Sequence, residues 1–215
     1  MIPKKDIFDF YKKSPFSTKL YIKIKLRICP LLAVETYFPK RGTVLDLGSG
    51  NGFFSSLLKM GSPERTVVGI DLDLKKVRQA RLLEARFEGL SFREGNIAES
   101  EYPAADIVSL IDVLYLIPYE VQEVILRRSF AALRPGGRLL LKDMDTRPRR
   151  KYAWNYFQET VAVKILGFTL GSKFYFRSRE DYIRLLEGIG FKVEPVPLDR
   201  GYWYPHIFFR CKKPE

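Results

Sequence analysis

The chain has 215 residues, with 37 Lys or Arg against 25 Asp or Glu, so its formal net charge is +12. This length suits a single domain with a sizeable buried core, and 46% hydrophobic residues exclude a wholly disordered chain. Two cysteines and one histidine exclude a disulfide framework and a metal site of several histidines, and no apolar run reaches the ~18 residues of a membrane span.

The first predicted element covers residues 20–28, where apolar residues alternate strictly with basic or tyrosine residues. This period of two is typical of a strand, and Pro30 ends the element. The next element, residues 43–47, has the pattern of a buried strand and runs into a tight glycine turn at residues 48–52.

The middle of the chain alternates predicted helices with predicted strands. The helices are expected over residues 53–60, 74–87 and 118–133, and the strands over residues 65–71, 91–94, 106–111 and 138–143. This alternation predicts a parallel sheet that is covered by helices on both faces.

The C-terminal part departs from the alternation. A helix predicted over residues 179–189 is followed by strands over residues 191–196 and 206–211, and with no helix between them these strands should pair antiparallel. About 35 residues between Asp143 and Arg179 have no place in the pattern. We expect them to form an insertion with a helix over residues 152–166.

The glycine turn differs from that of dinucleotide-binding domains. Those domains use Gly-x-Gly-x-x-Gly, and here the third glycine would fall on Phe53. Asp46 lies in the strand two residues before the turn, where its carboxylate suits a cationic amine or an ordered water. It would be poorly placed beside an anionic pyrophosphate.

Further motifs follow the glycine turn at regular intervals. After residues 44–52 come Asp71 at the end of the second strand, residues 95–97, residues 106–114 and residues 133–139. In this order and spacing they resemble the motifs of class I (Rossmann-like) S-adenosylmethionine (SAM)-dependent methyltransferases of the small-molecule or lipid type. The resemblance implies SAM as cofactor and S-adenosyl-L-homocysteine as product.

The resemblance also implies the fold. We expect an α/β, Rossmann-like, seven-stranded sheet of strand order 3-2-1-4-5-7-6, with the last strand antiparallel and helices on both faces. The family has a helical lid before its first strand, so the resemblance favours a helix over residues 15–29 against the strand that alternation predicts. A single domain would then comprise the lid (1–41), the SAM-binding core (42–145), a helical cap insertion (146–178) and a C-terminal part (179–215).

The implied cofactor site lies at the carboxyl ends of the parallel strands. Asp71 is expected at the ribose hydroxyls, Asn96 at the adenine, and Asp112 with Tyr115 near the methionine part. Asp71 and Asp112 have the alternative of capping a helix, and Asn96 that of stabilising a turn. No metal is expected. The cofactor-binding residues are expected to be Asp46, Gly48, Ser49, Gly50, Gly52, Asp71, Leu72, Asn96, Ile97, Asp112 and Tyr115.

The loop before the last strand should lie on the rim of the same edge. It brings His206, the best candidate for a general base, with Tyr202 and Tyr204 behind it as catalytic candidates. His206 has the alternative of a structural histidine at a strand start. Asp143 is either a second acid–base candidate or a helix cap.

The expected reaction is in-line transfer of a methyl group from SAM to a small hydrophobic or anionic acceptor, such as a lipid or a secondary metabolite. One alternative is an RNA methyltransferase that uses a basic surface. Against carbon methylation of cytosine, neither Cys29 nor Cys211 falls at a strand end on the rim. A second alternative is a SAM-binding protein without catalysis.

The distribution of charge bears on the partner. Residues 42–126 have eight basic and thirteen acidic residues, whereas residues 1–41 have ten and three, and residues 127–184 have fourteen and five. The basic excess therefore lies in two aromatic-rich segments on either side of the acidic one, where it favours an anionic acceptor or a peripheral contact with an anionic membrane over nucleic acid. The expected location is cytoplasmic.

Overall fold

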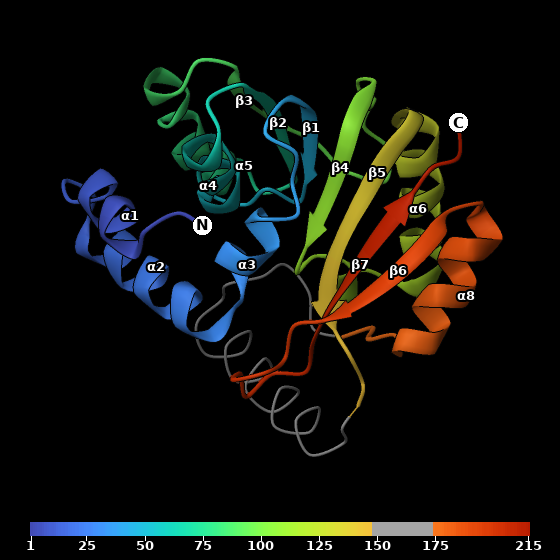
Figure 1. Cartoon of the computed structure of the whole chain (residues 1–215). Helices are drawn as coiled ribbons and strands as arrows, with labels where there is room; N and C mark the ends of the chain where they lie inside the picture. Colours follow the sequence, from blue (N-terminus) through green and yellow to red (C-terminus); the bar gives the residue numbers. More distant parts are fainter. Residues whose placement is uncertain (148–173) are drawn as a thin grey trace.

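One mixed sheet forms the centre of the computed structural model, which describes residues 1–147 and 174–215 (Figure 1). The strand order within the described residues is β3-β2-β1-β4-β5-β7-β6, as the sequence predicts. The strands are β1 (Gly42–Leu47), β2 (Arg65–Asp71), β3 (Leu90–Glu94), β4 (Ala105–Ile111), β5 (Leu133–Met144), β6 (Lys192–Pro197) and β7 (His206–Lys212).

The strand directions also agree with the sequence prediction. The first five strands pair in parallel, and β7 runs antiparallel to both of its neighbours, β5 and β6. Pairing of Met144 with His206 fixes the start of β7 beside the end of β5. The loop that leads into β7 therefore reaches the edge of the sheet at which the parallel strands end.

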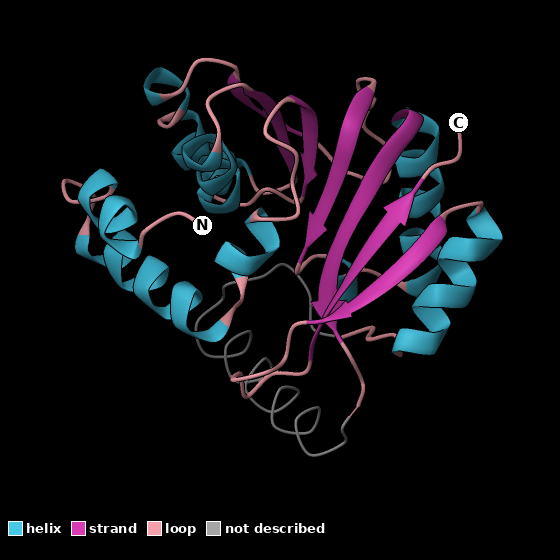
Figure 2. Ribbon diagram, in the orientation of Figure 1, coloured by secondary structure: helices cyan, strands magenta, loops and turns pink. Residues whose placement is uncertain are grey.

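Helices cover both faces of the sheet (Figure 2). One face carries α4 (Phe53–Gly61) and α5 (Leu74–Arg81), together with the N-terminal helices α1 (Lys4–Phe10), α2 (Phe16–Ile28) and α3 (Leu31–Glu35). The other face carries α6 (Tyr119–Ala132) and α8 (Arg179–Ile189). Successive strand residues supply the two cores, since Val44 packs with the first helical layer and Leu45 with the second.

The N-terminal segment confirms the helix that the family resemblance implies over residues 15–29. Helix α2 spans Phe16–Ile28, so the strand predicted from strict alternation is wrong. Alternation misleads here because helical spacing selects Ile22 and Leu26 for burial, while Phe16, Leu20 and Ile24 turn away from the core.

A buried ion pair joins the N-terminal segment to the core. The Arg65 guanidinium at the start of β2 lies 2.7 Å from the Glu35 carboxylate of α3, and both side chains are almost fully buried. The same guanidinium donates to the main-chain oxygens of Leu58, Phe38 and Pro39. The guanidinium charge is thus balanced by the Glu35 carboxylate, and its N–H groups are hydrogen-bonded within the protein.

Two element boundaries differ from the prediction by more than one residue. The helix expected over residues 74–87 ends at Arg81 and is followed by the short 3-10 helix η1 (Glu84–Arg86), where the Glu84 carboxylate accepts the Phe92 N–H at 2.7 Å. Strand β5 begins at Leu133, five residues before the predicted start. The helix predicted over residues 152–166 lies outside the described residues. Within the described ranges, no helix is long and apolar enough to cross a membrane.

Candidate cofactor and acceptor site

The glycine turn after β1 combines packing with an open surface. Gly48, Gly50 and Gly52 all have positive φ angles, of 74°, 56° and 77°, which favour glycine. A side chain at Gly48 would clash with Val113, and one at Gly52 would clash with Phe92. Only open space surrounds the corresponding position at Gly50. Two glycines are therefore required by packing, whereas the third leaves the main chain accessible to a ligand.

Asp71 holds this turn in shape. Its carboxylate accepts the Gly50 N–H at 2.7 Å and the Asp73 N–H at 2.9 Å. The cap of α5 is Asp73, whose side chain accepts the N–H groups of Lys75 and Lys76, so the helix-cap interpretation of Asp71 is wrong. A carboxylate can accept more than two hydrogen bonds, which leaves Asp71 able to accept ribose hydroxyls.

Asp46 lies beneath the turn with both carboxylate oxygens engaged. It accepts the hydroxyls of Ser55 at 2.5 Å and Ser109 at 2.6 Å, and burial raises its pKa. The sequence prediction of an amine or water partner did not include these two serines. Ser49 beside it is 9% exposed, and among the described residues its hydroxyl has no hydrogen-bond partner.

Three further cofactor-binding candidates follow the ends of β2 and β3. Asn96 accepts the Ala98 N–H through its side-chain oxygen at 3.0 Å, so it does stabilise a turn. Ile97 is buried next to it, and Leu72 is 58% exposed directly after Asp71. Leu72 therefore offers apolar surface at this edge, whereas Ile97 belongs to the core beneath it.

Asp112 sits at the centre of a charged cluster that the sequence analysis missed. Its carboxylate accepts hydrogen bonds from the ammonium groups of Lys142 and Lys25 and from the Cys29 thiol, the latter two at 3.3 Å. Hereafter the Asp112 cluster means Lys25, Cys29, Asp112 and Lys142. Asp112 also has a φ of 58°, an uncommon conformation for a residue other than glycine. It precedes no regular helix, so it is not the helix cap that was the alternative.

The charges of the Asp112 cluster shift one another's pKa values. Burial alone would raise the pKa of Asp112, but Lys142 and Lys25 outweigh it and lower that pKa below its usual range. Lys142 is fully buried, and its pKa is raised because Asp112 outweighs the effect of burial. Two ammonium groups thus share one carboxylate, which leaves a net positive charge on the Asp112 cluster.

Cys29 is close to the strand ends although it does not follow a strand. Burial raises the pKa of its thiol to about 11, and the neighbouring Asp112 carboxylate acts in the same direction. The thiol therefore stays protonated near neutral pH and is a poor nucleophile. Only one signal in the sequence pointed to this cluster, namely the lysine that follows three leucines in the buried strand β5.

His206, Tyr202 and Tyr204 come together as the sequence predicts. The Tyr202 and Tyr204 rings lie 5.3 and 5.7 Å from the His206 ring, centroid to centroid. His206 is 4% exposed, and its Nε2 lies 2.7 Å from the Ile28 carbonyl oxygen at the end of α2. Because a carbonyl only accepts, Nε2 carries the proton, and among the described residues Nδ1 has no partner.

The environment of His206 makes it a weak base. Burial, followed by the positive charge of Lys142, lowers its pKa to about 3. The imidazole is therefore neutral across the physiological range. Its role as a general base stays a prediction, and this pKa argues against strong proton abstraction.

Asp143 points to the opposite face of the sheet from Lys142. Its carboxylate lies 2.5 Å from the Tyr182 hydroxyl of α8, and burial raises its pKa to about 7. The cap of α8 is Ser178, so the helix-cap interpretation of Asp143 is wrong. Because Asp143 contacts α8, it lies on the other face of the sheet from the Asp112 cluster.

Tyr115 lies just beyond β4 in the 3-10 helix η2 (Leu114–Leu116), within a small aromatic cluster. Its ring stacks on Phe176 at 5.1 Å, and its carbonyl oxygen accepts the Tyr175 N–H. The chain that returns from the undescribed segment therefore packs against the expected cofactor edge.

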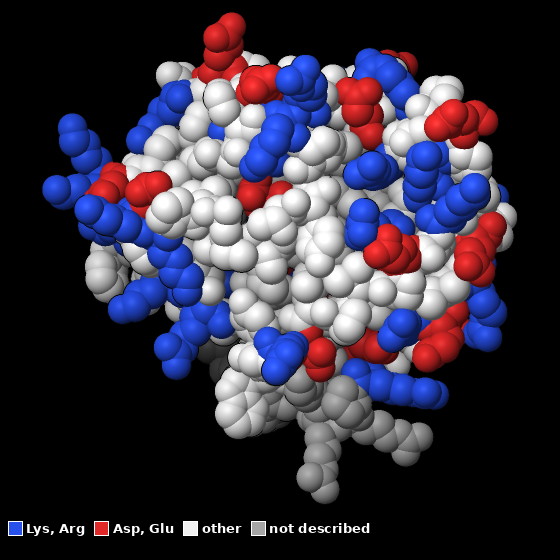
Figure 3. Space-filling view, in the orientation of Figure 1, with Lys and Arg blue, Asp and Glu red and all other residues white. Residues whose placement is uncertain are grey.

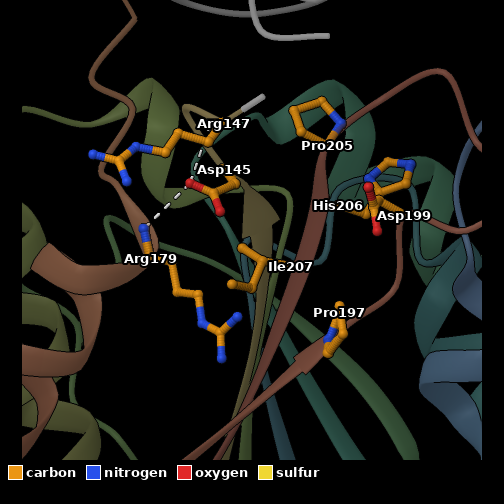
Figure 4. A pocket seen from close by; sticks show the side chains of 8 residues that line it. All are labelled: Asp145, Arg147, Arg179, Pro197, Asp199, Pro205, His206 and Ile207. Atoms are coloured by element: carbon orange, nitrogen blue, oxygen red, sulfur yellow. Dashed lines mark hydrogen bonds between the residues drawn. The ribbon is translucent and has the colours of Figure 1, made fainter. Parts of the chain in front are cut away.

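A hollow opens where β5, β6 and β7 meet the rim loop (Figure 4). The Asp145 carboxylate accepts the main-chain N–H groups of Arg147 and Arg179 on one side, and His206 and Asp199 lie across from it. Within the described residues, no three His, Cys, Asp or Glu side chains form a metal-binding group. The hollow is lined by Asp145, Arg147, Arg179, Pro197, Asp199, Pro205, His206 and Ile207.

Comparison with known proteins gives consistent matches. A family model described as a methyltransferase domain matches residues 21–196. Bacteriochlorophyllide d C-20 methyltransferase of Chlorobaculum tepidum is 25% identical over 177 residues, which are 80% of this chain and 49% of that protein. Demethylspheroidene O-methyltransferase of Rhodobacter capsulatus is 30% identical over 159 residues, which are 72% of this chain and 37% of that protein. This chain thus spans about half the length, or less, of these two relatives.

The fold is also found among solved structures. The S-adenosylmethionine-dependent methyltransferase SibL, in its apo form, superposes with a TM-score of 0.70 at 24% identity. The match covers 86% of this chain and 54% of SibL. At this identity the comparison supports the class I methyltransferase fold.

Proposed function

Since the chain belongs to the methyltransferase domain family, we propose that it transfers the methyl group of SAM to a small-molecule acceptor. The observation that carries this proposal is the glycine turn. Its main chain is open at Gly50, and the Asp71 carboxylate lies directly beside it. Ligands of open α/β sheets bind at this kind of edge, beyond the carboxyl ends of the strands.

The residues around the turn fit SAM. We propose that Asp71 accepts the ribose hydroxyls, that Asn96, Ile97 and Leu72 flank the adenine, and that the turn approaches the methionine part. The buried Ser49 hydroxyl has no hydrogen-bond partner among residues 1–147 and 174–215, and a bound ligand would satisfy it. When bound, SAM supplies an electrophilic methyl group on its sulfonium.

The remaining candidates belong to the methionine and acceptor side. Asp112 and Tyr115 keep their proposed place near the methionine part, and Asp46 supports the turn from beneath through Ser55 and Ser109. Tyr202, Tyr204 and His206 are proposed to line the acceptor. With its lowered pKa, His206 suits the orientation of an acceptor through Nδ1 better than the removal of a strongly held proton.

These features favour an acceptor with an acidic or already ionised nucleophile, such as a carboxylate or an acidic enol. The net positive Asp112 cluster suits the ionised form of such a group, whereas the unprotonated Nδ1 of His206 suits only its protonated form, from which it would accept a hydrogen bond. The two relatives are named for the methylation of bacteriochlorophyllide d and of demethylspheroidene. By analogy with them we infer that the acceptor is a small molecule with a large hydrophobic part.

Several finer expectations stay predictions. These are the division into a lid (1–41), a core (42–145), a cap (146–178) and a C-terminal part (179–215), the cytoplasmic location, and an anionic membrane as partner. RNA methylation and SAM binding without catalysis are the alternatives. A protonated Cys29 thiol gives no support to the cytosine-carbon route.

Calorimetry with SAM and S-adenosyl-L-homocysteine tests the central proposal. The protein should bind both at micromolar levels, and Asp71→Ala should weaken SAM binding about a hundredfold, because each lost hydrogen bond to a charged group costs ~1.5–3 kcal/mol. The matched control is Asp73→Ala, which removes the nearby helix-capping carboxylate and should leave the affinity intact. If neither ligand binds, or if Asp71→Ala binds SAM as tightly as the original protein, the proposal fails.

The acceptor class is tested with tritiated SAM. A small-molecule enzyme should label an organic-solvent extract of cells and leave bulk RNA unlabelled. Label in RNA alone would support the first alternative. Tight SAM binding with no labelled product in any extract would support the second.

A further inference from the structure

The outward side of α2 carries a row of exposed apolar side chains. Phe16, Leu20 and Ile24 are 76%, 45% and 47% exposed. They are spaced four residues apart, which puts them on one side of the helix, opposite the buried Ile22 and Leu26. Hereafter these three residues are the α2 stripe.

Basic side chains border the α2 stripe. Helix α2 contains no acidic residue, and Lys and Arg side chains gather along the edge of the molecule where α1 and α2 lie (Figure 3). Within the described part of the chain, none of the bordering basic groups forms an ion pair. They are the exposed side chains of Lys12, Lys13, Lys19, Lys23 and Arg27.

This combination differs from the other exposed apolar residues. Leu82, Val124 and Trp203 are exposed singly on separate elements, which is common on protein surfaces. The α2 stripe is continuous and lies among exposed cations, the pattern of a helix that lies in the headgroup region of an anionic bilayer. Such a surface accepts a row of apolar side chains without a shaped pocket, while its negative potential attracts the lysines.

We propose that α2 is an interfacial helix that seats the α2 stripe on an anionic lipid bilayer. The opposite side of the same helix contacts the site, because Lys25 donates to Asp112 and the Ile28 carbonyl accepts from His206. Docking through α2 therefore holds the site across one helix diameter, ~10 Å, from the lipid surface. The proposal goes beyond methyl transfer, since lipid binding requires neither SAM nor an acceptor.

Sedimentation of the purified chain with vesicles tests the proposal. The protein should pellet with vesicles of phosphatidylcholine and phosphatidylserine, remain in solution with phosphatidylcholine alone, and dissociate as salt is added. Replacing Lys19 and Lys23 by Glu should weaken binding at least about thirtyfold. Replacing Phe16, Leu20 and Ile24 by Ser should weaken it by about a hundredfold.

Matched variants control for composition. Leu82→Ser with Val124→Ser removes equally exposed apolar side chains elsewhere, and Lys75→Glu with Lys192→Glu reverses two exposed charges elsewhere; both should bind vesicles like the original protein. Thermal unfolding of each variant checks that it is folded, independently of SAM binding. Unchanged binding by the stripe variant would overturn the proposal. The proposal would also be overturned if the original protein did not bind vesicles and instead formed a dimer that the stripe variant dissociates. Binding of the original protein to RNA but not to vesicles would have the same consequence.

Discussion

Two buried residues near the end of β5 have pKa shifts of opposite sign. The pKa of His206 is lowered to about 3 by burial and Lys142, and the pKa of Asp143 is raised to about 7 by burial. Between about pH 3 and about pH 6.5, folded His206 lacks a proton that the unfolded chain binds, so its contribution to stability increases with pH. Folded Asp143 keeps a proton that the unfolded chain releases above pH ~4, so its contribution decreases with pH.

Single variants should separate the two effects. The difference in unfolding free energy between the original protein and His206→Gln should rise from about pH 3 to about pH 6.5, by up to ~1.4 kcal/mol per pH unit. The corresponding difference for Asp143→Asn should fall from about pH 4 to about pH 7. Urea unfolding across this range measures both. Profiles parallel to that of the original protein would contradict the assigned protonation states.

For single residues, the sequence predicts the main-chain conformation better than it predicts the hydrogen-bond partners of side chains. The glycines at positions 48, 50 and 52 follow from the motif, and all three have positive φ angles. Lys25 could not be predicted at Asp112, because the contact joins residues 87 positions apart and depends on how α2 docks. The serine partners of Asp46 could not be predicted either, because short hydroxyl side chains give no local signal of where they point.

Among the elements, α3 and β2 depend on the buried pair of Glu35 and Arg65. Glu35→Gln would leave the guanidinium buried without its counter-charge, and we expect a loss of ~3–5 kcal/mol in stability. The exposed pair of Glu64 and Arg41, at 3.7 Å, provides the matched control. Glu64→Gln should change stability by less than ~1 kcal/mol. Chemical denaturation compares them, and equal losses would refute the special role of the buried pair.

The helices and strands were predicted correctly where an apolar pattern was bounded by a turn signal. Strand β1 and helix α4 follow from an apolar run, a glycine turn and a second apolar run, and the antiparallel β6–β7 pair follows from the missing helix. The helical form of α2 could not be decided by period, because its lysines and isoleucines alternate in sequence while only every fourth residue is buried. Tertiary packing decided the conformation.

At the scale of the whole molecule, α2 is tied to the strand ends by Lys25 and by the Ile28 carbonyl. If residues 1–41 act as a lid, SAM should slow amide hydrogen exchange in α2 as well as in the glycine turn, and leave the edge strand β6 unchanged. Mass spectrometry of peptides after exchange measures this. Protection of the turn without protection of α2 would contradict the lid.

The charge of the chain is distributed unevenly between its regions. The net charge of +12 suggested a polyanionic partner, yet the core segment that supplies the glycine turn and Asp71 is acidic. Two lysines of the basic excess, Lys25 and Lys142, are neutralised in part by Asp112 inside the structure. The exposed cations on α1 and α2 are among those available to a partner.

The two-sided nature of α2 limits how its sequence can change in length. Each residue turns a helix by about 100°, so the deletion of one residue between Leu20 and Lys25 would rotate the outward side chains away from their present direction while the site contacts stay fixed. Insertions or deletions in α2 should therefore be tolerated only in multiples that restore the rotation, such as seven residues, whereas the turn at residues 12–14, between the buried Tyr11 and the start of α2, can vary in length more freely.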